Sequence, residues 1–212
     1  LGALDEEIAD ALAEGLGMAG DAIADWLHNN DCTPQKIASI LSDTMNYSAD
    51  QVVTNFNRLA RDLEDSAEVL VSVFNYNAYE LGEFMQNGGV ALNEMTSFMN
   101  NTLGYTVEVA SDVLHYLNTS NQAITEALSY GFNGSVTAVV EGLHHLDVPL
   151  SEISSLVVAE FPAVSYSDIA TTFQEIGKFG GEIAEAFKVG LGVTSFSQMG
   201  GILNDAGFAT YY

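Results

Sequence analysis

The sequence predicts an all-α protein, an α-solenoid-like array of about 14 short helices, and three observations support this. Residues 104–162 contain four versions of one pattern, in which a polar opener is followed by an apolar anchor and then by a Gly, Asn, Asp or Pro stop. Anchors of this kind recur along the whole chain, about 14.7 residues apart on average. Residues typical of helix starts recur at fixed distances before the anchors. Such regularity indicates short helices arranged as pairs of about 29 residues.

The anchor is the apolar residue that we expect on the buried face of each helix. Most steps between anchors are 14 to 16 residues, but one anchor, Leu70, is reached by a step of 18 and left by one of 11. We therefore predict a single all-helical repeat domain over residues 1–212, with an irregularity or bend near residues 59–80. An ordinary exposed, charged connection would explain that segment equally well. The predicted anchors are Ile8, Ile23, Ile37, Val52, Leu70, Leu81, Met95, Val109, Ile124, Val139, Ile153, Ile169, Ile183 and Met199.

The residue types found one and four positions before the anchors are those that favour the start of a helix. The position one before it is mostly acidic or Gln, which suits the first turn of a helix because of the helix dipole. Four pairs have the spacing of a capping box: Ser48/Gln51, Asn77/Glu80, Ser165/Asp168 and Ser195/Gln198. The N-cap candidates four positions before the anchor are Thr33, Ser48, Ser66, Asn77, Ser120, Ser135, Ser165 and Ser195. These carboxylates therefore favour a structural role over a catalytic one.

The rest of each repeat has the features of a short amphipathic helix. The residue after the anchor is usually small, which permits close approach between helices, and apolar residues three and four positions after it complete a buried stripe. Helices of nine to eleven residues are too short to be stable alone, so neighbouring helices must stabilise them. The helix pair is shorter than a tetratricopeptide unit and lacks its Trp/Gly/Tyr/Pro signature.

Composition excludes some classes of partner. The 212 residues include 29 acidic and only five basic side chains, so the net charge is −24. Such a surface repels phosphate backbones, so we expect no nucleic-acid partner. The longest apolar-leaning run, residues 189–204, is broken by Gly, Ser and Gln, so we expect no membrane span. The single cysteine, Cys32, rules out an intramolecular disulfide framework.

The histidines are the only residues that suggest a metal site. His28, His115 and His144 each lie five or six places after an anchor, and His145 follows directly. Equivalent positions on stacked helices are roughly 10 Å apart, which is too far for ligands of one ion. Exposed histidines in a last helical turn are the better interpretation, and the Cys32/His28 pair lacks an orienting group for a nucleophile. We predict no catalytic, cofactor-binding or metal-binding residue and no enzymatic activity.

Acidic residues also recur two positions after the anchor. On stacked helices these side chains would form an acidic ladder. The ladder is either a solvated face or a surface for a divalent cation or a basic protein partner. Its members are Asp10, Asp25, Glu83, Glu126, Glu141 and Glu185.

The ends of the chain suggest the function. The first and last repeats keep the core pattern, and the segments outside them, residues 1–4 and 208–212, are apolar or aromatic. Because terminal repeats of solenoids normally have a polar outer face, either these tails fold back over the ends or the ends meet another molecule. If that molecule is another copy of the chain, the contact can continue into a filament or layer. The leading interpretation is a non-enzymatic structural protein that self-assembles end to end, or a segment of a longer array. The alternative is a recognition module for a peptide or basic protein.

Two weaker indications complete the sequence analysis. Acidic, Lys-poor composition is typical of extracellular or cell-surface proteins, and four Asn-x-Ser/Thr triplets begin at Asn46, Asn100, Asn118 and Asn133. A run of methionines could serve a small apolar ligand, although adaptable core packing explains them as well. They are Met45, Met85, Met95 and Met99.

Overall fold

The computed structural model describes the backbone of residues 2–208 and the side chains of residues 6–208. Over this part of the chain there are fourteen α-helices and no β-strand, so the predicted all-α class is confirmed. The apolar segments expected at the two ends lie mostly outside the described residues. The helices are α1 (Gly2–Asp10), α2 (Gly20–Asn29), α3 (Pro34–Met45), α4 (Ala49–Arg58), α5 (Leu63–Ser72), α6 (Ala78–Asn87), α7 (Leu92–Asn101), α8 (Val107–Tyr116), α9 (Asn121–Gly131), α10 (Val136–His145), α11 (Leu150–Glu160), α12 (Tyr166–Glu175), α13 (Gly180–Leu191) and α14 (Phe196–Asp205). A π-helical segment, η1 (Ala11–Gly15), continues α1.

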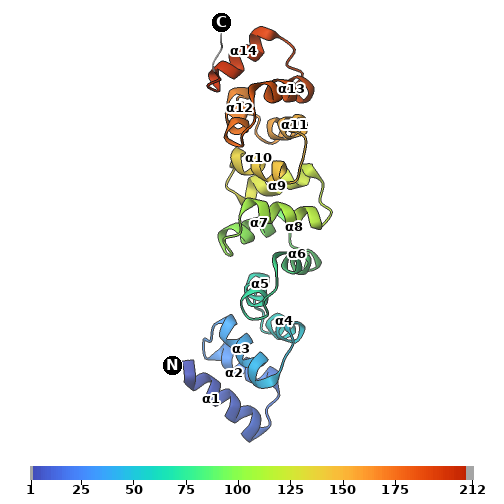
Figure 1. Ribbon diagram of the computed structural model, residues 1–212. Helices are drawn as coiled ribbons and strands as arrows, with labels where there is room; N and C mark the ends of the chain where they lie inside the picture. Colours follow the sequence, from blue (N-terminus) through green and yellow to red (C-terminus); the bar gives the residue numbers. More distant parts are fainter. Residues whose placement is uncertain (1, 209–212) are drawn as a thin grey trace. The chain divides into compact units, whose positions relative to one another are not determined.

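The helices belong to two compact units, Leu1–Gly88 with α1–α6 and Gly89–Tyr212 with α7–α14. In the first unit α3 packs against α1, α2, α4 and α5, and α5 also packs against α4 and α6 (Figure 1). Its core contains the buried side chains of Ile23, Leu27, Ile37, Leu41 and Phe56. The burial of these apolar side chains is the main stabilising contribution to helices of this length. A single domain over both units stays a prediction.

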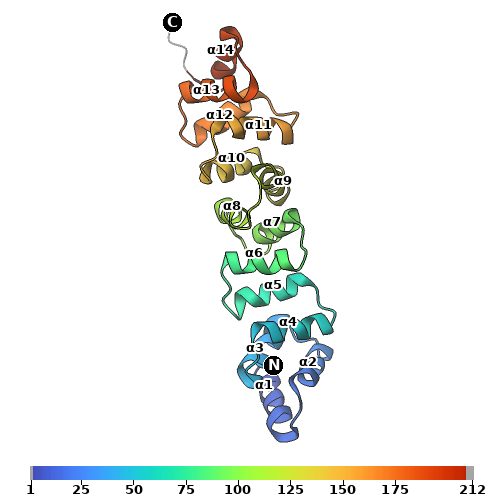
Figure 2. The same cartoon turned by 90° about the vertical axis from the view of Figure 1, so that its right-hand side faces the viewer.

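In the second unit every helix also contacts the helix two places away in the chain (Figure 2). One row consists of α7, α9, α11 and α13, and the other of α8, α10, α12 and α14. Most successive helices, such as α9 and α10, pack against each other as well. This packing places residues about 29 to 35 positions apart in the sequence next to each other, as the hydrogen bonds from Thr96 to Ala127 and from Ser155 to Gly190 show.

Most of the predicted helix starts are confirmed. The side chains of Thr33, Ser48, Asn77, Ser120, Ser135, Ser165 and Ser195 accept hydrogen bonds from backbone N–H groups of the first turn. Both halves of the capping box are present at Ser48/Gln51, Asn77/Glu80 and Ser165/Asp168. Each such cap is worth about 1 kcal/mol of helix stability.

The predicted anchor of α5 is wrong by one helical turn. The N-cap of this helix is Asp62, so the position that holds the anchor in the other helices is Ser66, which is fully buried. Leu70, also buried, lies four residues later. The alignment selected it because it required an apolar anchor. With Ser66 in place, the steps from Val52 and to Leu81 are 14 and 15 residues, and the sequence period does not slip. A bend near residues 59–80 stays a prediction.

A smaller shift affects α8. Its N-cap is Thr106, so Ala110 takes the anchor position and is buried, while Val109 is half-buried. Among the other predicted anchors, only Ile8 and Met199 are half-buried; the remaining ones are buried. Both exceptions lie in the first and last helices of the array.

The connections between helices repeat one backbone conformation. A residue with φ between 54° and 83° stands two or three positions before the N-cap of nearly every helix after α1. Glycine and asparagine, which adopt this left-handed region most readily, occupy most of these positions, and Asp31, Ala60 and Asp147 occupy the rest. The Gly, Asn and Asp residues that were expected to end the helices therefore do so by adopting a left-handed backbone conformation.

Small residues allow close helix contacts in the second unit. A Cβ atom on Gly131 of α9 would lie 2.6 Å from Cβ of Thr96 and 2.8 Å from its carbonyl carbon. In the observed structure, Thr96 Oγ1 donates a hydrogen bond of 2.8 Å to the Ala127 carbonyl, and Asn100 Nδ2 donates one of 2.9 Å to the Gly131 carbonyl. Gly131 thus permits side chains of α7 to bond directly to the backbone of α9.

Among residues 2–208, none of the helices combines the length and the apolarity that a membrane crossing requires.

Candidate functional site

The histidines of the second unit have different surroundings. His115 lies exposed in the last turn of α8, whereas His145, in the last turn of α10, places Nε2 3.0 Å from Oδ1 of Asp112 on α8. His144 is half-buried, and this burial, with the positive charge of Lys178 as a smaller cause, lowers its pKa. In the part of the chain that the structure describes, no group of three or more His, Cys, Asp or Glu side chains could hold a metal ion.

His28 and Cys32 of the first unit are joined through an arginine. Arg61 Nη2 donates a hydrogen bond of 3.1 Å to the Cys32 carbonyl and lies 3.3 Å from His28 Nδ1, while Nη1 contacts Asp65 at 3.0 Å. The guanidinium also lies 5.8 Å from the ring centre of Phe56. Arg61 thus links the end of α2 and the connection after it to α5, and this arrangement suits a structural role more than a cysteine nucleophile.

The predicted acidic ladder is divided between the two rows of helices. In the second unit Glu126 and Glu185 lie on α9 and α13, in one row, while Glu141 lies on α10, in the other. Several members also have polar neighbours: Asp25 pairs with Arg58 at 2.7 Å, and Glu185 pairs with Lys188 at 3.2 Å. The column is therefore not one continuous surface, because successive helices belong to different rows.

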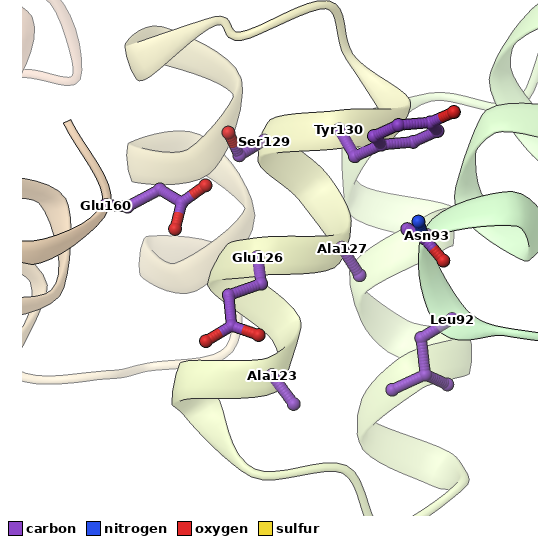
Figure 3. Close-up of a pocket in the computed structure, with 8 residues that line it drawn as sticks. All are labelled: Leu92, Asn93, Ala123, Glu126, Ala127, Ser129, Tyr130 and Glu160. Carbon is purple, nitrogen blue, oxygen red and sulfur yellow. The ribbon is translucent and has the colours of Figure 1, made fainter.

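One pocket has the composition of a binding site. It has a volume of about 420 Å³ and lies on α9, with α7 and the end of α11 as its walls. Figure 3 shows Glu126 and Glu160 on the side of α9 toward α11, and Tyr130 and Asn93 on the side toward α7. The pocket is lined by Leu92, Asn93, Ala123, Glu126, Ala127, Ser129, Tyr130 and Glu160, a set that includes two carboxylates and no basic residue.

Several polar groups of this pocket have no protein partner. Within residues 6–208, Glu126 accepts a hydrogen bond of 3.1 Å from Gln122, but no side-chain hydrogen bond involves Asn93, Ser129 or Glu160. Ser129 is only 8% exposed, and its neighbour Tyr130 is 60% exposed. The pocket therefore offers carboxylate, amide and hydroxyl groups together with an accessible aromatic ring.

A second surface lies at the last two helices. Phe196, the first residue of α14, is 97% exposed, and Phe179, the N-cap of α13, is 76% exposed. Between the two helices is a pocket of about 320 Å³ whose lining includes Ala184, Val193 and Met199. No residue of α14 is buried, although its sequence follows the same pattern as the interior helices. The surface combines these apolar side chains with the charged pair Glu185 and Lys188, and the pocket has room for a further side chain.

Sequence reasoning identified one residue of the α7/α9/α11 pocket, Glu126, and missed the others. Asn93, Glu126 and Glu160 are separated by 33 and 34 residues, which is one helix pair plus about one turn. This regular spacing is visible in the sequence. A search within single repeats could not find it, because the residues of the pocket come from three different repeats.

Neither a family model nor a curated protein matches this sequence. The functional argument therefore depends on the geometry of the two surfaces alone.

Proposed function

We propose that this protein is a non-enzymatic structural protein of the cell surface or extracellular space, which self-associates end to end through its terminal repeats. The observation that carries the proposal is the exposed apolar surface of α14. Exposed apolar patches of this kind mark interaction sites in soluble proteins. The acidic, Lys-poor composition supports the location.

Comparison with α12 indicates what would cover this surface. Tyr166, the first residue of α12, packs against Phe187 of the next helix, with ring centres 6.0 Å apart. Phe196 occupies the same first position in α14. A helix packed on α14 as α13 packs on α12 would therefore cover Phe196. We propose that a second copy of the chain supplies it.

The charge of the first helices sets the conditions for such a contact. Glu6, Glu7, Asp10 and Glu14 are all exposed on α1 and η1. A head-to-tail contact would bring this acidic surface toward Glu182 and Glu185, so screening by salt should strengthen association. A tail-to-tail contact between two copies of α14 would instead close into a dimer.

Sedimentation velocity and electron microscopy at low and high salt test the proposal. We expect association that increases with salt and that Phe196→Ser abolishes. Tyr116→Ser, which changes an exposed aromatic residue on α8, is the matched control and should leave association unchanged. A monodisperse monomer at every concentration and salt level would overturn the proposal.

A second candidate function is recognition of a peptide or basic protein, and the α7/α9/α11 pocket favours it. Its two carboxylates and exposed Tyr130 suit a cationic partner. This function predicts a soluble monomer with one binding surface. Loss of the charges of Asp25, Glu126 and Glu141 together should weaken binding, with Glu126 responsible for most of the effect because Asp25 already pairs with Arg58.

A further inference from the structure

We infer that the α7/α9/α11 pocket binds the guanidinium group of an arginine side chain in a basic peptide. The inference rests on the second candidate function and deepens it, since it names the group that is recognised and the residues that recognise it.

The charge around the pocket is the first argument. Glu126 and Glu160 contribute two carboxylates, and no basic residue lines the pocket to neutralise them. The second unit has only two basic residues, Lys178 and Lys188, and Lys188 pairs with Glu185 at 3.2 Å. A cationic ligand would therefore meet uncompensated negative charge.

The placement of Glu160 strengthens this argument. It is the last residue of α11, where the helix dipole disfavours a negative charge. It is half-buried, and no cation pairs with it within residues 6–208. Glu160 therefore does not stabilise its own helix, and a bound cation would supply the missing partner.

The second, independent observation is the unpaired hydroxyl of Ser129, a residue that is largely buried. This side chain lines the pocket, is 8% exposed and has no hydrogen-bond partner among the described side chains and backbone. Most other buried Ser and Thr side chains of this unit donate to a backbone carbonyl, as Ser111 and Ser154 do at 2.7 Å each. The Ser129 hydroxyl is therefore available at the pocket, where it can accept a hydrogen bond from a ligand.

The number and type of groups favour a guanidinium over a metal ion. Two carboxylates without a third ligating side chain do not make a metal site, and the described residues contain no larger group of this kind. A guanidinium has five donors in one plane, which several separated acceptors can satisfy, and it stacks on aromatic rings. Glu126 and Glu160, on the side of α9 toward α11, offer the carboxylate acceptors, and Tyr130 and Asn93, on the side toward α7, offer a ring and an amide to the rest of the arginine side chain and its peptide. A pocket of about 420 Å³ accommodates a side chain of this size.

Binding of two synthetic peptides to the full chain tests the inference. One is an end-capped peptide of alternating Gly and Arg, and the other has Lys in place of Arg, so that both carry the same charge. Fluorescence anisotropy at low salt measures the affinity of each. We expect the Arg peptide to bind roughly fivefold tighter than the Lys peptide, because arginine binds carboxylates through two parallel hydrogen bonds.

Three variants locate the site. Glu160→Gln should weaken binding of the Arg peptide about tenfold, and Tyr130→Ala about threefold. Glu175→Gln, which removes an exposed carboxylate of α12 outside the pocket, should change affinity less than twofold. Glu160→Gln should also raise the melting temperature slightly, since it removes a negative charge from a helix C-terminus. Opposite effects on stability and binding would distinguish a binding residue from a structural one.

Each alternative result is informative. No binding of either peptide would overturn both the inference and the recognition function. Binding that Glu160→Gln and Glu175→Gln weaken equally would overturn the pocket but leave recognition by the general acidic surface. Equal affinity for the two peptides would overturn the preference for guanidinium. Calcium binding that Glu160→Gln abolishes, without peptide binding, would replace the inference with a cation site.

Discussion

Helices α12 and α14 follow the same sequence plan but differ in what they bury. Each begins with a serine N-cap, Ser165 or Ser195, and each has an apolar anchor four residues later. In α12 the residues Ile169, Ala170 and Phe173 are buried, whereas α14 has no buried residue. Helix α12 packs against α10, α13 and α14, whereas the main contacts of α14 within residues 2–208 are with α12 and α13. Burial in this protein therefore depends on having neighbours on both sides, which a repeat cannot provide for itself.

The largest expected difference between the two helices is at their phenylalanines. Phe173 of α12 is fully buried, with its ring centre 6.0 Å from that of Phe187, so Phe173→Ala should lower the free energy of unfolding by about 4 kcal/mol. Phe196→Ala in α14 should change it by less than about 0.5 kcal/mol. Urea unfolding of the monomer, followed by circular dichroism, measures both. Similar losses would show that α14 is covered in solution.

Replacing a glycine by alanine should destabilise the protein in an interior helix and stabilise it in the last helix. Gly131→Ala would force the new Cβ against Thr96 and should destabilise the protein by about 2 kcal/mol. Gly200 of α14 has open space around its Cα, so Gly200→Ala should stabilise the helix by about 0.5 to 1 kcal/mol. Thermal and urea unfolding give both values. A stabilising Gly131→Ala would contradict the close contact between α7 and α9.

Substitutions at positive-φ positions in the connections should affect stability regardless of which helices pack nearby, because the cost of the backbone conformation is local. Ala60 has a φ of 54°, which is unfavourable for alanine, so Ala60→Gly should stabilise the first unit by about 0.5 kcal/mol. The reverse change at Gly177, which has a φ of 83°, should destabilise the end of α12 by about 1 kcal/mol. The denaturation midpoints of the two variants should move in opposite directions.

The smallest expected effect concerns the histidines of interior helices. Burial lowers the pKa of His144 below its ordinary value of 6.5, so the folded state binds this proton less readily than the unfolded state. The corresponding stability is present above that pH and is lost as pH falls below it. His144→Gln should therefore reduce the loss of stability between pH 7 and pH 5.5, as urea unfolding at the two pH values would measure. Equal profiles for wild type and His144→Gln would contradict the burial effect.

Helix starts were predictable from sequence because capping is local. Ser48 and Gln51 bond to each other's backbone across three residues, and that spacing is visible in the sequence. The anchor of α5 was not predictable in the same way. Ser66 is buried because of its position in the helix, and its hydroxyl lies 3.5 Å from the Asp62 carbonyl oxygen. A search for apolar anchors could not select a serine at this position.

The α7/α9/α11 pocket could not be predicted from the sequence for a different reason. Asn93, Glu126 and Glu160 come together because α7, α9 and α11 stack in one row. The period predicts that helices repeat, but it does not say which helices become neighbours. Glu126 and Glu141 lie in different rows for the same reason, because α9 and α10 are successive helices and successive helices belong to different rows.

By itself the sequence determined the class of the fold, the number of helices and most of their starting residues, because propensity, capping and turn conformation act over a few residues. Only the tertiary structure decided which helices stack in a row, which of two similar helices is buried and which polar groups remain without a partner. The physical reason is that short helices are stabilised by contacts with helices one and two places away. Those contacts depend on how the repeats are arranged in space.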